Sequence, residues 1–187
     1  LNTITCGRLR IGKNDGGFIG NMLISNPISI TGTAYLTLYT YGTITQSAGA
    51  TLTVPNLTLH TTAANNLGNV TLNEANSVGN LGAYINGGTG AAFSFTNAAP
   101  LAISAVDTRQ DFSTQINGIQ AYGGQEVITL TTTGGSASTL TINQPLNSNN
   151  GHILLTTSGL QTFNHNLTFG SGTLVLNSAS GVTQNTT

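Results

Sequence analysis

The stretch AVDTRQDF contains the residues of this sequence best suited to catalysis, because two acidic side chains flank a basic one. Asp107, Arg109 and Asp111 would share one face of an extended strand, because side chains alternate along a strand. Enzymes that cleave polysaccharides on a β-helix use paired carboxylates, or a base beside a cation. The other acids, however, are scattered singly, so nothing else supplies a converging group. We therefore interpret the stretch as a projecting loop with a local ion pair, predict no catalytic residue and no enzyme, and keep polysaccharide cleavage as an alternative.

The histidines offer no metal site. His60, His152 and His165 stand singly, without a cysteine or carboxylate at the spacing of a ligand set. The calcium-binding nonapeptide repeat requires an aspartate, which the phrase GGTGAAFSF lacks. We expect neither a metal nor another cofactor.

Threonine and tyrosine suggest two kinds of binding surface. A flat ladder of Thr-x-Thr pairs could order water, but the pairs do not recur at one period, and outward threonine is also a favoured strand surface. Ice binding is kept as an alternative only. The tyrosines could form an exposed stacking strip for sugars, or a ladder that packs at a subunit contact, which we favour. The residues concerned are Thr51/Thr53, Thr129/Thr131 and Thr139/Thr141, and Tyr35, Tyr39, Tyr41, Tyr84 and Tyr122.

Charge excludes several classes of partner. Charged residues make up 5% of the 187 residues and the formal net charge is −1, whereas soluble domains usually carry roughly 25%. Without a basic patch, neither nucleic acid nor a charged membrane surface is an expected partner. No apolar run approaches the ~18 residues of a membrane span, so membrane insertion is not expected. The single cysteine, Cys6, cannot form an internal disulfide and does not fix the compartment.

The chain consists almost wholly of strand and turn residues, with 32 Thr, 24 Gly and 22 Asn. Short bursts alternate apolar and polar residues and end at Gly, Asn or Ser, a period-two pattern typical of strands with one buried face. No stretch matches an amphipathic helix. The bursts include AYLTLYT, TLTVPNLTLHT, NVTLNEA, AFSFTNA, LAISA, VITLTTT, STLTINQ, HILLTTS, HNLTFGS and GTLVLNS.

This combination predicts an all-β fold, a right-handed parallel β-helix or β-solenoid. Coils that stack at ~4.8 Å would place each residue directly over a residue of the same kind in the next coil. Stacked identical charges would repel one another, which accounts for the scarcity of charged residues. With ~20–25 residues per coil, the chain would hold about eight coils.

One phrase returns late in the chain. GTITQ begins at Gly42 and GVTQ begins at Gly181, a separation of 139 residues. Low-complexity composition could produce this echo by chance. We interpret the phrase as the start of a coil, with Ile44 pointing inward and Gln46 placed to hydrogen-bond along the stack, and its return as the solenoid starting over.

Longer phrases resemble a known family. LTLYTYGTITQSAGATLTVPNLTLHT, NVTLNEANSVGNLGA, AFSFTNAAPLAISAV and LTINQPLNSNNGHILLTTSGLQTFNHNLTFGSGTLVLNSASGVTQ are similar to repeat regions of filamentous-haemagglutinin-like bacterial adhesins and surface fibres. In that family, GxITQ, GxLTLNSAxG and AxPLxIxxV segments recur through long right-handed parallel β-helices. The resemblance covers about residues 30–187. It implies an architecture but no catalytic motif, so no functional residue can be carried over.

The first thirty residues depart from this pattern. Their phrase CGRLRIGKND holds three of the four basic residues. We expect residues 1–30 to form an N-terminal cap, a junction or a joining strand, and residues 31–187 to form the β-solenoid repeat region. No secretory leader is visible, so a secreted protein would be present here as a mature or excised segment.

The sequence therefore predicts a structural segment of an extracellular bacterial adhesin or surface fibre, on the cell surface or outside the cell. Both ends of a solenoid expose strand edges. The expected partners are flanking repeats or copies of the chain at these ends, with glycans or a host or neighbouring cell surface beyond them. A self-assembling subunit of an extracellular filament is the alternative.

Overall fold

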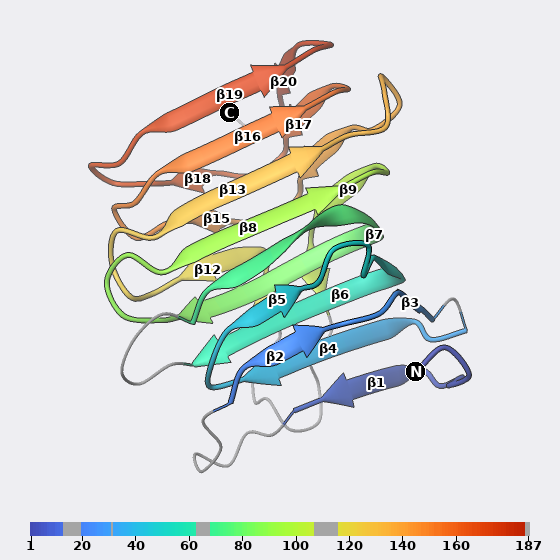
Figure 1. The fold of residues 1–187 in the computed structure, drawn as a ribbon. Coiled ribbons are helices and arrows are strands. Elements are labelled where there is room, and N and C mark those ends of the chain that lie inside the picture. The colour runs from blue at the N-terminus through green and yellow to red at the C-terminus, as the bar shows by residue number, and fades with distance from the viewer. Residues whose placement is uncertain (13–19, 31, 63–67, 107–115, 186–187) are drawn as a thin grey trace.

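The computed structural model describes residues 1–12, 20–30, 32–62, 68–106 and 116–185, and these wind into a stack of parallel β-coils without a helix (Figure 1). The predicted all-β parallel solenoid is confirmed, and its right-handed winding stays a prediction. The strands are β1 (Arg8–Ile11), β2 (Met22–Ile24), β3 (Ile28–Ser29), β4 (Tyr35–Thr40), β5 (Ile44–Gln46), β6 (Leu52–Thr62), β7 (Val70–Asn86), β8 (Ala92–Asn97), β9 (Leu101–Ile103), β10 (Ala105–Val106), β11 (Ile116–Asn117), β12 (Ile119–Ala121), β13 (Val127–Thr132), β14 (Leu140–Ile142), β15 (Leu146–Asn147), β16 (Ile153–Thr157), β17 (Gln161–Phe163), β18 (Leu167–Thr168), β19 (Leu174–Ser178) and β20 (Val182–Gln184).

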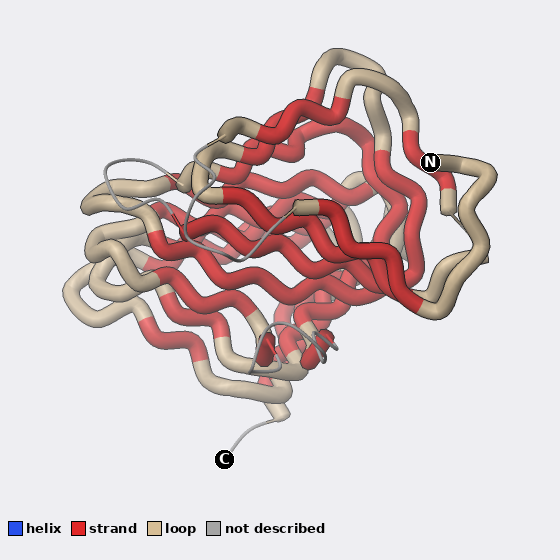
Figure 2. Tube along the Cα trace, turned by 90° about the horizontal axis from the view of Figure 1, so that it is seen from below, coloured by secondary structure: helices blue, strands red, loops and turns tan. Residues whose placement is uncertain are grey.

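Each coil passes once through a front sheet and then through a back sheet. The front sheet contains β2, β5, the start of β7, β8, β13, β16 and β19 (Figure 1). The back sheet contains β1, β3, β4, β6, the rest of β7, β9, β12, β14, β15, β17, β18 and β20. Seen from below, successive coils superpose around one interior (Figure 2).

The number of coils differs from the prediction. The front sheet defines about six turns rather than about eight, because the coils are longer than expected. Five of the six register steps span 21–26 residues, but Ile128 follows Phe93 by 35 residues, since a hairpin is inserted there. The inward residues that align along this sheet are Met22, Ile44, Val70, Phe93, Ile128, Ile153 and Leu174.

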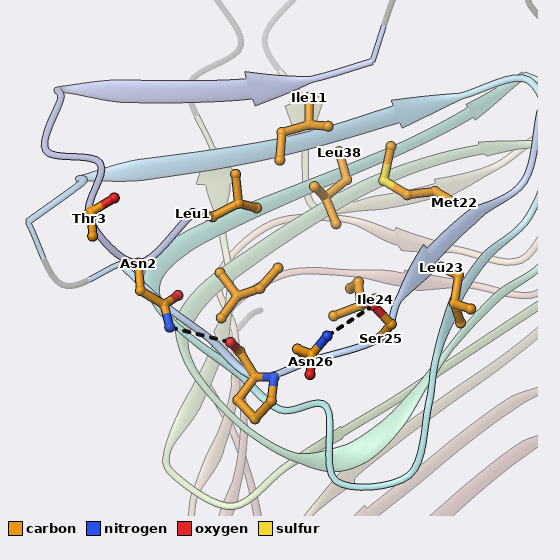
Figure 3. A pocket seen from close by; sticks show the side chains of 12 residues that line it. Leu1, Asn2, Thr3, Ile11, Met22, Leu23, Ile24, Ser25, Asn26 and Leu38 are labelled. Carbon is orange, nitrogen blue, oxygen red and sulfur yellow. Dashed lines mark hydrogen bonds between the residues drawn. The ribbon is translucent and has the colours of Figure 1, made fainter.

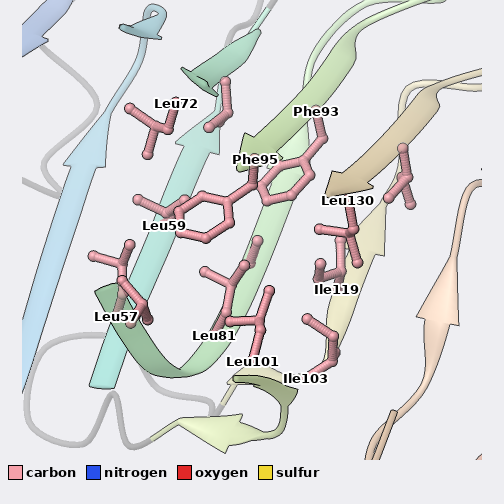
Figure 4. Packing of buried hydrophobic residues seen from close by; sticks show 14 of the residues in the cluster. Leu57, Leu59, Leu72, Leu81, Phe93, Phe95, Leu101, Ile103, Ile119 and Leu130 are labelled. Carbon is pink, nitrogen blue, oxygen red and sulfur yellow. The ribbon is translucent and has the colours of Figure 1, made fainter. Parts of the chain in front are cut away.

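The interior is a continuous column of aliphatic side chains with three phenylalanines, Phe93, Phe95 and Phe163. Phe93 and Phe95 of β8 point into it among leucines of neighbouring coils (Figure 4). Each such side chain stabilises the fold by roughly 1.5–3 kcal/mol when fully buried. The alternation predicted from the sequence is confirmed in the middle coils, where these predicted pairs are all buried: Leu36/Leu38, Leu52/Val54, Leu57/Leu59, Val70/Leu72, Leu101/Ile103, Ile128/Leu130, Leu140/Ile142 and Ile153/Leu155.

Amide side chains, of which those of Asn76 and Asn97 are buried, join successive coils at the corner between the sheets. The Gln46 side chain donates from Nε2 to Asn76 Oδ1 in the next coil, at 2.7 Å, as the sequence predicts. Asn76 Oδ1 also accepts the Leu52 amide at 2.8 Å. Asn97 repeats the arrangement one coil further on, where its side chain both accepts from the Val78 amide and donates to the Val78 carbonyl.

The echo between the two Gly-x-Thr-Gln phrases is not a structural repeat. Ile44–Gln46 lies in the front sheet and pairs with Met22–Ile24. Val182–Gln184 lies in the back sheet and pairs with Gln161–Phe163. Inward Ile44 is confirmed, but the two phrases occupy different sides of the coil, so the solenoid does not start over at Gly181.

The long coil contains a hairpin that leaves the back sheet and returns to it. Strands β10 and β11 pair antiparallel, and the Gly118 amide donates to the Ser104 carbonyl at the base. A Cβ at Gly82 would lie 3.1 Å from Val106 and 3.4 Å from Ile116, so the base of the hairpin packs against the outside of the coil. The hairpin therefore lengthens the coil without shifting its neighbours.

The first strands already belong to the two sheets. Strand β1 pairs in parallel with β4, β2 with β5, and β3 with β6. Asn2 accepts the Ser29 amide at 2.9 Å through Oδ1, which occupies a backbone donor on the outer edge of β3. A cap or junction role for residues 1–30 stays a prediction.

A column of glycines allows the coils to stack at the other corner. Gly42, Gly68, Gly151 and Gly172 each stand two residues before an inward residue of the front sheet. A Cβ at Gly151 would lie 1.7 Å from the Glu126 carbonyl oxygen, and one at Gly172 would lie 1.7 Å from the Gly151 carbonyl oxygen. The backbones of successive coils therefore touch here, and any side chain at these two positions would separate them.

Replacing Gly151 by alanine should destabilise the fold by about 3 kcal/mol, because the added methyl group overlaps a rigid backbone carbonyl. Gly7→Ala is the matched control, since a Cβ there meets no atom within 4 Å. Denaturant unfolding measures both variants. Equal stability of the two would contradict close contact at this corner.

Candidate functional site

The charged side chains that the sequence makes the best candidates for catalysis lie outside the described residues. These are Asp107, Arg109 and Asp111, together with Lys13 and Asp15. The charged side chains within the described ranges are Arg8, Arg10, Glu74 and Glu126. Arg8 lies over the Tyr35 ring, 5.5 Å from its centroid. The expectation that the chain is not an enzyme stays a prediction.

Residues capable of holding a metal do not gather in the part of the chain that the structure describes. No group of three or more His, Cys, Asp or Glu residues comes together there. His152 Nδ1 accepts the Thr173 amide at 3.0 Å, and His165 Nδ1 accepts the Asn166 amide at 2.9 Å, so both side chains hydrogen-bond the local backbone. Within the same residues, no helix suited to crossing a bilayer is found.

The carboxylate of Glu126 is buried at the corner of the stack where the column of glycines lies. From the sequence alone, this residue is only one of the scattered acids. It is 1% exposed and stands in the register position that Gly151 holds in the next coil and Ala91 holds in the preceding one. Neither carboxyl oxygen accepts a hydrogen bond from the described residues. Burial raises the pKa of Glu126, and the backbone amides of Glu126, Gly123 and Gly124 near the carboxylate oppose that shift only in part. Glu126 belongs to no group of three or more His, Cys, Asp or Glu among the described residues.

An aromatic ladder runs along the outside of the back sheet, from Tyr41 through Tyr39, His60 and Tyr84 to Tyr122. Successive ring centroids lie 5.6, 4.3, 4.6 and 4.8 Å apart. Tyr39, His60 and Tyr84 occupy one register column, on β4, β6 and β7. The rings therefore pack on one another within the chain, and a role of this ladder at a subunit contact stays a prediction.

Burial changes the titration of this ladder. It lowers the pKa of His60 to about 4. It also raises the pKa of Tyr39 to about 12, and Tyr84 shifts in the same direction for the same cause. All three side chains are therefore neutral at neutral pH. Sequence reasoning missed His60 as a member, although its spacing of 21 residues from Tyr39 and 24 from Tyr84 matches the length of a coil.

The Thr-x-Thr pairs do not form one flat array. Thr129/Thr131 lies on the front sheet, whereas Thr139/Thr141 and Thr51/Thr53 lie along the back sheet. The front sheet does carry one column of small hydroxyl side chains, interrupted by Leu23 at one end and by Leu154 and Val175 at the other. Its members are Thr45, Thr71, Ser94 and Thr129.

Both ends of the stack are hollow. The hollow at the first coil is mainly apolar, whereas polar side chains such as His165 and Gln184 also line the one at the last coil. At the first coil, a hollow of about 520 Å³ opens between β1, β2 and β3, and Ile11, Met22 and Leu38 line it (Figure 3). At the last coil, a hollow of about 420 Å³ is lined by Leu174 and Val182, among others. The outer edges of β19 and β20 pair with no further strand among the described residues. These two ends are the candidate interaction surfaces.

No family model, curated protein or solved structure matches the chain. Its stacked coils are consistent with the repeat architecture of the adhesins and surface fibres that the sequence resembles. The architecture is therefore established by the fold, and membership of that family is a proposal.

Exchanging Glu126 for glutamine should stabilise the protein at neutral pH. The carboxyl pKa is higher in the folded than in the unfolded chain, so the free energy of unfolding falls as pH rises above the unfolded pKa. The Glu126→Gln variant has no carboxylate and does not lose stability in this way. The amount by which its free energy of unfolding exceeds that of the parent should therefore shrink as pH is lowered. Glu74→Gln, which alters a carboxylate that accepts the Gly49 amide near the surface, is the control. Denaturant unfolding at several pH values checks this, and an advantage independent of pH would refute it.

Exchanging His60 for phenylalanine should remove an acid-sensitive component of stability. The folded chain binds fewer protons than the unfolded chain between about pH 4 and 6.5, so the free energy of unfolding falls as pH drops through this window. The full loss would be about 3 kcal/mol. The difference in free energy of unfolding between parent and variant, measured by denaturant unfolding, should therefore change with pH. His165→Gln is the control and should leave the parent's profile unchanged; a His60→Phe difference that is flat with pH would count against a buried neutral imidazole.

Proposed function

We propose that the chain is a structural segment of an extracellular bacterial adhesin or surface fibre, in which stacked β-coils form a stiff rod. The observation that supports this most is the parallel pairing of the front sheet over six turns, with one register shift between Leu72 and Asn76 and one apolar column inside the stack. Every middle coil is hydrogen-bonded to two neighbours, so bending the stack requires many bonds to lengthen together.

The course of the chain suits a place in series with other segments. It enters the stack at one end and leaves at the other (Figure 1), and six turns at ~4.8 Å make a rod about 30 Å long. We propose that flanking coils of the same kind cover the two hollow ends, where open strand edges accept a further strand. Glycans or a host or neighbouring cell surface are the proposed targets of the assembled fibre.

The uncharged surface supports a passive structural role. The residues from 127 to 187 contain no Asp, Glu, Lys or Arg. Stacked identical charges would repel one another across a parallel ladder, so a surface of Thr, Ser and Asn lets coils repeat without that penalty. We propose no catalytic step and no cofactor.

An antibody against the folded chain tests the proposed location. We expect it to label intact cells of the organism that encodes the chain, and we expect external protease treatment to reduce the label. An antibody to a cytosolic protein is the control. Labelling that requires permeabilised cells would refute an extracellular role.

Competition tests the proposed adhesive fibre. We expect the purified chain, added in excess, to reduce attachment of the same cells to their surface, and we expect Gly151→Ala, which should not stack correctly, to fail as a competitor. Equal effects of both proteins would indicate a non-specific coating rather than adhesion.

A further inference from the structure

Two tyrosine rings contact each other in a tilted arrangement across adjacent coils of the back sheet. Tyr84 lies on β7 and Tyr122 directly follows β12, and their ring centroids are 4.8 Å apart with an angle of 31° between the ring planes. The other contacts of the aromatic ladder have angles of 53–80°. Among the described ring contacts, Tyr84 and Tyr122 are thus the pair of phenols closest to parallel.

The register of the coils fixes this contact. Tyr84 points outward between inward Ala83 and Ile85, and its direct neighbour in the next coil is Gln120. Tyr122 lies two residues further along, held by a 2.9 Å hydrogen bond from its amide to the Ile85 carbonyl. Aromatic side chains reach such diagonal positions across neighbouring strands, and the Tyr122 ring does so here.

Accessibility differs along the ladder. Tyr122 is 49% exposed, whereas Tyr39 is 2% exposed. An oxidant in solution therefore reaches the ladder at Tyr122, while Tyr84 lies in ring contact beneath it. A tyrosine phenol is protonated at neutral pH, and burial raises the pKa of Tyr84 further, so oxidation of this ring must release a proton along with the electron.

We propose that Tyr84 and Tyr122 form an oxidative cross-linking site, where a one-electron oxidant such as a haem peroxidase supplied with hydrogen peroxide joins them into a dityrosine. Each phenol loses one electron to the oxidant and one proton to water. The two phenoxyl radicals then form one carbon–carbon bond between ring positions adjacent to the hydroxyl groups. The hydrogen on each bonded carbon moves to its oxygen, which restores two phenols, and hydrogen peroxide is reduced to water.

The product would tie two coils together covalently. The bond joins β7 to the segment after β12 and encloses the β10–β11 hairpin between its two ends. The cross-link therefore closes the longest coil of the stack, where the path between two front strands spans 35 residues. Closing a loop in the unfolded chain stabilises the folded one, so the modified protein should resist unfolding more than the unmodified one.

Mild oxidation of the full chain tests the site. The protein is treated with a haem peroxidase and hydrogen peroxide at low protein concentration, and the monomer is isolated. We expect dityrosine fluorescence in the monomer, a mass lower by two hydrogen atoms, and a proteolytic peptide pair that joins Tyr84 to Tyr122. Cross-linked monomer should also unfold at a higher denaturant concentration than untreated protein.

Two variants separate this site from general tyrosine oxidation. Tyr122→Phe keeps the ring and should lose the intramolecular dityrosine signal and the joined peptides. Tyr41→Phe changes the opposite end of the same ladder, where the rings meet edge to face, and should retain both. Retention of the signal by Tyr122→Phe, or peptide pairs in the parent that join other tyrosines instead, would overturn the assignment. Because the peptide map of the parent decides the matter alone, misfolding of a variant leaves the test intact.

Discussion

The parallel register between successive coils is the constraint on which the rest of this structure depends. Each middle strand is hydrogen-bonded to the coil before it and to the coil after it, so no coil can shift without breaking both ladders. A shift by one residue would also turn the aliphatic column of Leu57, Leu81 and Ile103 outward. The half-buried amide of Gln46 and the buried amide of Asn76 bridge coils at the corner, and this register brings them within hydrogen-bond distance.

The same constraint explains what the surface and corners of the rod contain. Neutral hydroxyl and amide side chains can stack on copies of themselves, whereas like charges cannot. Glycine is required where carbonyl groups of one coil touch the next, as at Gly151 and Gly172. Glu126 shows how local the requirement is, because the loop around Gly123 and Gly124 makes room for a buried carboxylate in the same register position.

Much of this architecture could be predicted from the sequence because alternation is a local signal. Pairs such as Leu36 and Leu38 identify the inward face without knowledge of the neighbouring coil. The number of coils was wrong because the inserted hairpin has no local signature, and the echo at Gly181 misled because a short phrase does not say in which sheet it lies. The aromatic ladder and the position of Glu126 emerge only when the register is known, since their members are one or more coils apart.

The hairpin of β10 and β11 has a consequence for how such a rod can change. Ser104 donates its amide to the Leu81 carbonyl and Gly118 accepts the Ala83 amide, so the excursion leaves and rejoins the coil beside a single residue, Gly82. Among the described residues of this excursion, β10 and β11 pair with each other and not with the ladders above or below. Substitutions and insertions in such an excursion are expected to leave the scaffold intact. The rod thus carries one excursion beside a regular frame, a place where a recognition sequence or a foreign epitope can be inserted without redesign of the solenoid.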